Sequence, residues 1–190
     1  MICPNCGKQI PDWSKFCPYC GTRIPLSTLI GGYIGNDEAK KHNDLGVSYY
    51  NSDNFDEAEK EYREAIRINP DYAEAHYNLG ILFYYLERYD EAEKEFREVI
   101  RINPNIAVAH YDLGDLLTDL KRYDEAEKEY REAIKIYPDY AEVHGDLGLL
   151  LKNLKRYDEA KKEILKAKEL FKKQGRSEYV ELFDRILKDF

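Results

Sequence analysis

The sequence repeats itself every 34 residues from residue 39 onward. A Leu-Gly dipeptide, an alanine, a proline and a histidine each recur at this step. The positions that keep it are Leu45-Gly46, Leu79-Gly80, Leu113-Gly114, Leu147-Gly148, Ala58, Ala92, Ala126, Ala160, Pro70, Pro104, Pro138, His42, His76, His110 and His144. A chain with such a period stacks similar units, and each unit buries its apolar face against its neighbours. The repeat therefore predicts a solenoid.

Each unit contains two stretches with helical spacing of apolar residues. In the second unit these stretches are Ala73–Leu86 and Tyr89–Ile102, and both show the periodicity of an amphipathic helix. Pro104 ends the second stretch, because proline and the residue before it disfavour a continuing helix. The small residues Gly80 and Ala92 allow the two helices to approach closely. Each unit is thus predicted to be a pair of packed helices.

The unit resembles the tetratricopeptide repeat, whose signature runs W-x-x-L-G-x-x-Y, then A-x-x-x-F, then A and P. In the second unit the corresponding residues are His76, Leu79, Gly80, Phe83, Ala92, Phe96, Val99 and Pro104. The histidines stand where the family has tryptophan, and we interpret them as half-buried packing residues. The resemblance implies an all-α fold, a right-handed superhelical solenoid of helix–turn–helix repeats. The repeat domain spans residues 38–174, with units at 39–72, 73–106, 107–140 and 141–174.

The end of the chain departs from the repeat. Lys172 stands where the fourth unit would have its proline, so the last repeat helix can continue. Residues 175–190 then place apolar side chains on one side of a predicted helix: Tyr179, Val180, Leu182, Phe183, Ile186 and Leu187. We interpret residues 175–190 as a capping helix that shields the last apolar face of the solenoid. A dimerisation face is the alternative interpretation.

All four cysteines lie near the N-terminus, in two C-x-x-C pairs separated by ten residues. The pairs are Cys3 with Cys6 and Cys17 with Cys20. Four thiolates at this spacing fit a tetrahedral metal site with Zn–S distances of about 2.3 Å. Two disulfides, a thioredoxin-like redox motif and a four-thiolate iron site are the alternatives. Disulfides are disfavoured in a reducing compartment, and no βαβ pattern surrounds the cysteines.

Residues 1–24 resemble the short zinc ribbons of many archaeal and bacterial proteins. The resemblance implies one Zn²⁺ held by Cys3, Cys6, Cys17 and Cys20. Four thiolates complete the coordination sphere, so the expected role of this ion is structural and not catalytic. A segment this short cannot bury a sufficient core by itself, and metal binding would supply its folding free energy. Residues 25–37, which contain Pro25 and three glycines, are the expected linker to the repeats.

Charge and hydropathy exclude several classes of protein. The net charge is −8, which argues against a general nucleic-acid binder. No apolar run approaches the about 18 residues of a membrane span, and no signal-peptide pattern is found. We therefore expect a cytoplasmic protein. No phosphate-binding loop is present, since Gly31–Gly35 lacks the Lys-Ser/Thr of a P-loop, and no serine has a partnered histidine in the pattern, so we expect no enzymatic activity.

The resemblance implies that the first helix of each unit lines a concave groove for a peptide or a partner's helix. The side chains we expect to bind there are Tyr77, Asn78, Tyr84, Tyr111, Asp112, Asp115 and Asp119. The basic clamp that chaperone-binding members use falls on Asn43, Val108 and Asp112, so that clamp is absent. Carboxylates beside tyrosines suit a basic segment, through ion pairs and cation–π contacts. A solvated acidic helix face is the alternative.

These features predict a non-catalytic scaffold that binds a protein or peptide, with a basic partner expected. The alternative function is a nucleic-acid- or transcription-associated factor that acts through the zinc ribbon. The ribbon carries Lys8, Lys15 and Arg23, which could contact phosphates. The acidic repeats would repel the same phosphates, so the scaffold is favoured.

Overall fold

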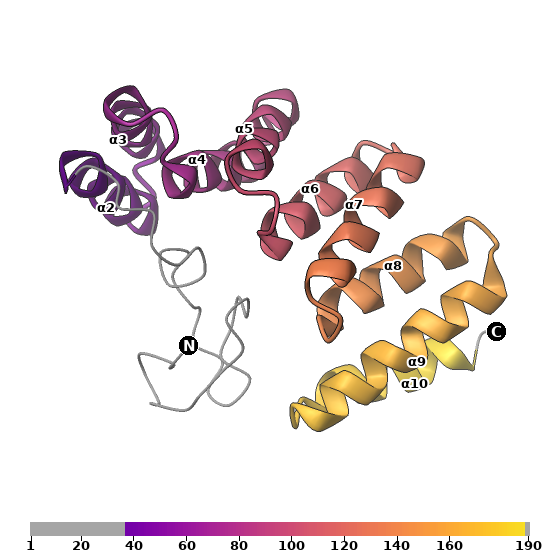
Figure 1. Ribbon diagram of the computed structural model, residues 1–190. Helices are drawn as coiled ribbons and strands as arrows, with labels where there is room; N and C mark the ends of the chain where they lie inside the picture. The colour runs from indigo at the N-terminus through magenta and orange to yellow at the C-terminus, as the bar shows by residue number, and fades with distance from the viewer. Residues whose placement is uncertain (1–36, 189–190) are drawn as a thin grey trace. The chain divides into compact units, whose positions relative to one another are not determined.

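The structure, a computed structural model, describes residues 37–188 of the chain. Every regular element in this part is an α-helix, as the repeat predicts (Figure 1). The helices are α2 (Asp37–Asn51), α3 (Phe55–Ile68), α4 (Ala73–Tyr85), α5 (Tyr89–Ile102), α6 (Ala107–Asp119), α7 (Tyr123–Ile136), α8 (Ala141–Asn153), α9 (Tyr157–Lys173) and α10 (Ser177–Leu187). The zinc ribbon and the linker predicted from the sequence lie outside the described residues.

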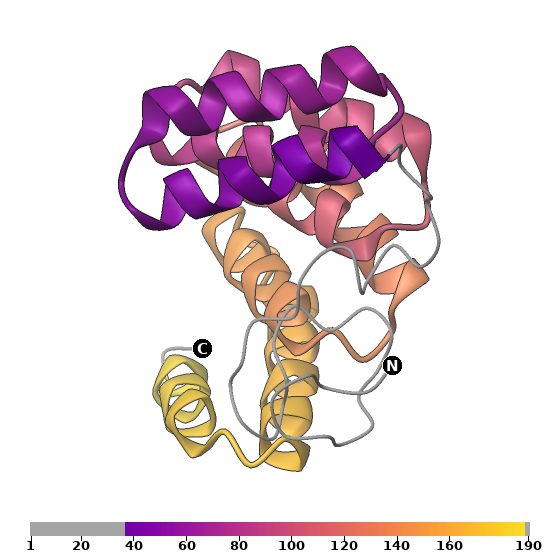
Figure 2. The ribbon, with the colours of Figure 1, turned by 90° about the vertical axis from the view of Figure 1, so that its left-hand side faces the viewer.

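The chain forms two compact units, and the boundary between them falls within α6, after Ala109. The described part of one unit contains α2 to α5 and the first residues of α6. The other begins at His110 and continues through α10. Each unit is built of helix pairs, as in Figure 2, where α2 and α3 lie side by side.

A glycine in each first helix sets the spacing within a pair. A Cβ atom at Gly80 would lie 2.8 Å from a ring carbon of Phe96 on α5, and one at Gly46 would lie 2.6 Å from the Tyr62 ring on α3. Both rings are buried. The Leu-Gly dipeptides of the repeat therefore exist because a side chain of the second helix occupies the place of a Cβ atom. This side chain is an aromatic ring in the first three repeats and Ile164 in the fourth.

The first helix of the array has a more polar outer face than its counterparts. Leu45 on α2 is 42% exposed, whereas its counterpart Leu79 on α4 is 1% exposed. The exposed Ser48 on α2 corresponds to the buried Leu82 on α4. Polar substitution of this kind is typical of a terminal repeat, whose outer face contacts water.

The last helix, α10, packs against α9 at the other end of the array. Phe183 is buried, and its ring stacks on Phe171 with the centroids 5.8 Å apart. Arg176 fixes the turn between α9 and α10, since it pairs with Glu142 at 2.5 Å and lies over the Tyr179 ring at 4.1 Å. The aromatic side chains of α10 therefore cover the apolar surface that α8 and α9 leave open.

Candidate partner-binding surfaces

In the unit that ends at Ala109, the predicted binding residues lie on α4 and differ in accessibility. Tyr77 is buried, with its ring 6.0 Å from that of Phe96. Asn78 is half-buried, and its Nδ2 donates a hydrogen bond of 2.8 Å to Oδ1 of Asn43 on α2. Tyr84 is half-buried, and its ring lies 5.9 Å from the Tyr89 ring. Tyr77 is therefore mainly a packing residue here, whereas Asn78 and Tyr84 reach the surface.

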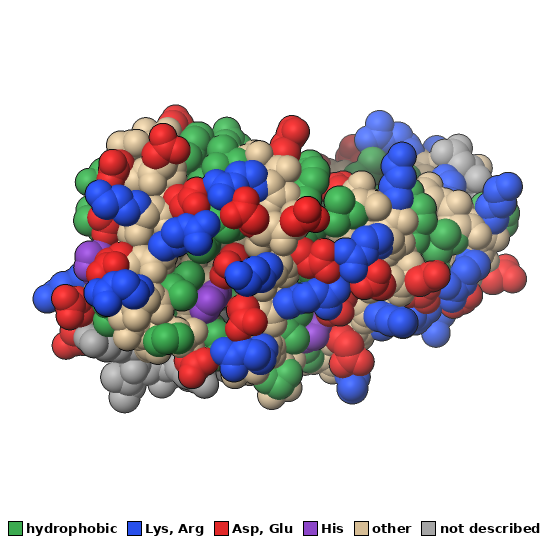
Figure 3. All heavy atoms as spheres, turned by 90° about the horizontal axis from the view of Figure 1, so that it is seen from above, with side chains coloured by type: hydrophobic (Ala, Val, Ile, Leu, Met, Phe, Trp, Pro, Cys, Tyr) green, Lys and Arg blue, Asp and Glu red, His purple; other side chains and the backbone are tan. Residues whose placement is uncertain are grey.

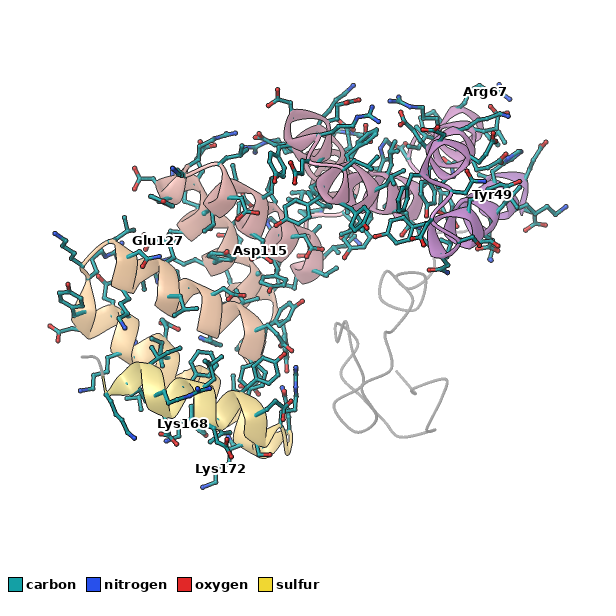
Figure 4. All side chains as sticks on the ribbon, turned by 180° about the vertical axis from the view of Figure 1, so that it is seen from behind. Tyr49, Arg67, Asp115, Glu127, Lys168 and Lys172 are labelled. Carbon is teal, nitrogen blue, oxygen red and sulfur yellow. The ribbon has the colours of Figure 1, made fainter. Side chains whose placement is uncertain are left out.

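In the unit that begins at His110, the predicted residues lie on α6, and two carboxylates are held by tyrosine hydroxyls. The Tyr111 hydroxyl donates a hydrogen bond of 2.8 Å to Oδ2 of Asp146 on α8. The Tyr130 hydroxyl on α7 donates one of 2.8 Å to Oδ1 of Asp115. Asp119 is exposed and Asp112 is buried. The solvent exposure of the predicted acidic residues therefore increases along α6 from Asp112 through Asp115 to Asp119. Asp115 on α6 and Glu127 on α7 are labelled in Figure 4.

The tyrosines that hold these carboxylates are neutral donors. Burial raises the pKa of the Tyr111 hydroxyl well above its usual value, and the charge of Asp115 adds to the effect. Burial also raises the pKa of the Tyr130 hydroxyl, again with a contribution from Asp115. A neutral hydroxyl that donates to a carboxylate leaves the negative charge in place. The hydroxyls of Tyr111 and Tyr130 therefore hold the carboxylates of Asp146 and Asp115 in position as neutral donors.

The four histidines form a second recurring arrangement, which the sequence analysis did not predict. Each histidine lies on the first helix of its repeat, and its Nδ1 contacts a glutamate Oε2 on the second helix of the same repeat. The distances are 2.5 Å for His42 with Glu61, 2.6 Å for His76 with Glu95, 2.6 Å for His110 with Glu129 and 2.6 Å for His144 with Glu163. The glutamates lie 19 residues after the histidines in every repeat, and this constant spacing was the available signal in the sequence.

The His76 pair is the most buried of the four. His76 is 7% exposed and Glu95 8%, and Nε2 of His76 lies 3.0 Å from the Pro70 carbonyl oxygen. Both ring nitrogens therefore face acceptors, and a doubly protonated ring satisfies both. Burial alone would lower the pKa of His76, but the hydrogen bonds to Glu95 and to Pro70 outweigh it, so that the pKa is raised. Each histidine therefore joins the two helices of its repeat through a contact with a glutamate.

The His76–Glu95 pair makes stability depend on pH. Its contribution is fully present below the usual pKa of 6.5 for histidine and is lost as the pH rises through the higher pKa of the folded chain. We expect the melting temperature of the wild type to fall more than that of Glu95→Gln between about pH 6 and 8. Thermal melts followed by circular dichroism measure this difference. Glu61→Gln, in the more exposed His42 pair, is the matched control with a smaller effect; equal pH slopes for all three proteins would contradict the assignment.

Arginines and glutamates pair on the surface of the second helices. Arg88 pairs with Glu59 at 2.5 Å and with Glu91 at 2.7 Å, so it links two successive repeats. Arg156 repeats the link to Glu127 at 2.5 Å. In Figure 3 basic and acidic side chains are interspersed over the visible face. Exposed pairs of this kind contribute about 0–1 kcal/mol each, so this face requires no binding function.

The described residues lack other obvious chemistry. Between residues 37 and 188, no group of three or more His, Asp or Glu side chains is placed to hold a metal ion. Within the same range, no helix has the length and apolar character needed to cross a lipid bilayer. The predicted zinc ligands, Cys3, Cys6, Cys17 and Cys20, fall outside this range. As a donor set, four thiolates in two C-x-x-C pairs fit Zn²⁺.

Protein-family models match both the repeats and the N-terminal cysteine segment. Profiles of the tetratricopeptide repeat match residues 43–105 and 77–141, and residues 117–179. A zinc-ribbon domain profile matches residues 2–24. A comparison with curated proteins found no match.

Solved structures resemble the described fold. A crystal structure of MamA is 25% identical to this chain, with a TM-score of 0.69. The match covers 73% of this chain and 81% of the MamA chain. A second MamA structure is 23% identical, covers 79% and 81%, and has a TM-score of 0.66. YrrB, titled a TPR protein with an unusual peptide-binding site, is 23% identical, covers 71% and 70%, and has a TM-score of 0.64.

Proposed function

The chain belongs to the tetratricopeptide-repeat family, and on that premise we propose that it is a non-catalytic scaffold that binds a basic segment of a partner protein. The binding residues would lie on the first helices of the repeats. In the unit that begins at His110, the proposed site centres on Asp115 and Asp119 of α6 and Asp146 of α8, beside Tyr111. The predicted Asn78 and Tyr84 of α4 would contribute in the other unit.

The observation that carries this proposal is the charge of α6. This helix contains Asp112, Asp115 and Asp119 and has neither lysine nor arginine. The second helices carry lysine and arginine beside their acids, whereas the sequence of α6 carries neither. An unbalanced acidic helix attracts a cationic partner and excludes an acidic one.

Pre-organisation strengthens the case for a binding surface. The side chains of Asp115 and Asp146 are already oriented by the hydroxyls of Tyr130 and Tyr111. Little rotamer entropy would be lost when a lysine or arginine pairs with them. A carboxylate has two oxygens and about four lone-pair sites, so a tyrosine hydrogen bond does not exclude a contact with a base. The same tyrosines add aromatic area of the kind that is frequent at interface hot spots.

Family and fold support the coarser part of the proposal. Repeats of this family serve mainly as interaction modules and not as enzymes, and YrrB is described as having a peptide-binding site. Its identity of 23% to this chain supports a common fold. The basic character of the partner comes from the charges on α6 and α8 of this chain.

The proposal predicts the effect of neutralising the acidic surface. In the triple variant Asp115→Asn, Asp119→Asn, Asp146→Asn, the amide oxygens at positions 115 and 146 can still accept the tyrosine hydrogen bonds, so the fold should persist. We expect this variant to bind a fluorescently labelled lysine-rich peptide about tenfold more weakly, which corresponds to about 1.4 kcal/mol. Fluorescence anisotropy measures the affinity, and circular dichroism verifies the fold.

A matched control changes the same net charge elsewhere. Asp90→Asn, Asp124→Asn, Asp158→Asn alters exposed aspartates in the first turns of second helices. This control should bind the peptide as the wild type does. Equal weakening by both triple variants would mean that only net charge matters, and no weakening by either would place the binding site elsewhere.

The second candidate function is nucleic-acid binding through the zinc ribbon, and the profile match over residues 2–24 favours it. Binding of an oligonucleotide that decreases steeply with salt, as counterion release requires, would support this alternative. Binding of a protein partner by the repeats with weak salt dependence would support the scaffold.

A further inference from the structure

Three aromatic rings cluster at the surface beside the turns that follow α2 and α4, on residues at the ends of α2 and α4 and at the start of α3. The centroids of Tyr50 and Phe55 lie 5.8 Å apart, those of Phe55 and Tyr85 5.1 Å, and those of Tyr50 and Tyr85 6.2 Å. Tyr85 is 60% exposed, more than any other large hydrophobic residue in the described part of the chain. We call Tyr50, Phe55 and Tyr85 the aromatic cluster; all three belong to the unit that ends at Ala109.

The later repeats show that the fold does not require this cluster. The turn residues Asp53, Glu87, Lys121 and Lys155 occupy equivalent positions and share a positive φ of 57°, 59°, 60° and 61°. The backbone is therefore the same in all four turns. Yet the place of Tyr85 is taken by Asp119 and Asn153 in the later repeats. The place of Phe55 keeps an aromatic ring, as Tyr89, Tyr123 and Tyr157. Since the same turn forms without a ring at the place of Tyr85, the turn does not require the Tyr85 ring, which completes the aromatic cluster.

The charge of these turns changes along the chain. The first two repeats carry Asp53 and Glu87 where the last two carry Lys121 and Lys155. Asp53 and Glu87 are exposed, and neither forms an ion pair or hydrogen bond through its side chain with another described residue. Arg88, the one base in these two turns, is committed to Glu59 and Glu91. The aromatic cluster therefore lies beside acids that no local base neutralises.

We infer that the aromatic cluster, with Asp53 and Glu87 at its rim, is a second binding surface for a lysine- or arginine-bearing peptide segment. A cation over an exposed aromatic ring gains electrostatic stabilisation, and the acids add ion-pair attraction. The alkyl stem of lysine or arginine also packs on the rings. A phosphate-bearing ligand would be repelled by the same carboxylates. This surface is separate from the proposed site on α6 and α8 and does not depend on it.

Exchange of residues between equivalent turns gives a test that spares the fold. Asp53→Lys with Glu87→Lys installs the residues that the last two repeats carry at the same φ. We expect this double variant to bind a labelled tetra-lysine peptide at the aromatic cluster about tenfold more weakly than the wild type, as loss and reversal of charge pairs require. Lys121→Glu with Lys155→Glu is the matched control, and it should not weaken that binding.

A second pair of variants tests the rings. Tyr85→Ala removes the most exposed ring of the cluster, and Tyr157→Ala removes a tyrosine of similar exposure, 53%, from the start of α9. Isotope-labelled full-length protein is titrated with the peptide and followed by nuclear magnetic resonance. The inference expects shifts at Tyr50, Phe55 and both turns in the wild type and in Tyr157→Ala, and their loss in Tyr85→Ala.

The outcomes separate this surface from the proposed function. Shifts at the aromatic cluster that survive in the Asp115, Asp119 and Asp146 triple variant would support it as an independent site. Equal binding by wild type, Tyr85→Ala and the double lysine variant would overturn the inference, even if the site on α6 is real. Stronger shifts with a single-stranded oligonucleotide than with the peptide would also overturn it.

Discussion

Replacing Phe183 by alanine is expected to lower the free energy of unfolding by about 3–5 kcal/mol, the usual range for a buried phenylalanine. Phe183 is 4% exposed and stacks on Phe171. It also fills space that another residue gives up, because a Cβ atom at Gly145 would lie 2.7 Å from Cζ of Phe183. Loss of this ring would uncover the apolar surface of α8 and α9. Denaturant unfolding followed by circular dichroism measures the change.

The neighbouring Leu182 provides the control for Phe183. Leu182 is 39% exposed on the same helix, so Leu182→Ala should change stability by at most about 0.5 kcal/mol, as surface substitutions do. Gly145→Ala should destabilise by about 1–3 kcal/mol, because it overpacks the place where Phe183 lies. Equal, small effects of Phe183→Ala and Leu182→Ala would show that α10 does not cap the array.

Replacing Cys17 by serine is expected to abolish tight binding of one zinc ion. Structural zinc sites contribute about 10–16 kcal/mol of apparent binding free energy at neutral pH, and loss of one thiolate opens the tetrahedral set. The helical signal should change little, because α2 to α10 lie outside the ribbon. Metal analysis of the purified protein and far-ultraviolet circular dichroism measure the two quantities.

The metal analysis also separates the alternatives for the cysteines. Ser14→Ala, in the same segment, should retain one zinc ion per chain. Iron in place of zinc, or disulfides that resist alkylation, would contradict the zinc site. A large loss of helical signal in Cys17→Ser would show that the ribbon and the repeats share a core.

The helices could be predicted from the sequence because the repeat constrains them several times over. The stretch expected over Tyr89–Ile102 has the same bounds as α5. The missing proline at Lys172 lets α9 continue to Lys173. In each case one residue type has one strong physical effect, such as proline at a helix end, and the same signal recurs at a fixed step.

Pairwise contacts between helices could not be predicted in the same way. The sequence shows Asp115 and Asp119 on one helix stripe, but it does not show that Tyr130 of the next helix donates to Asp115. It likewise presents Glu95 as one of many charges on an outer helix, although Glu95 faces His76 across the pair. Such contacts depend on how each helix is rotated about its axis. The apolar periodicity shows which face of a helix is buried, but it does not show which side chains on that face meet.

The most direct test of the central claim is hydrogen exchange of the full-length protein, with and without a bound lysine-rich peptide. The account predicts slower exchange in the first helices of the repeats, notably α6 and α8, and unchanged exchange in the second helices α7 and α9. Protection confined to the second helices, or to residues 1–24, would contradict it.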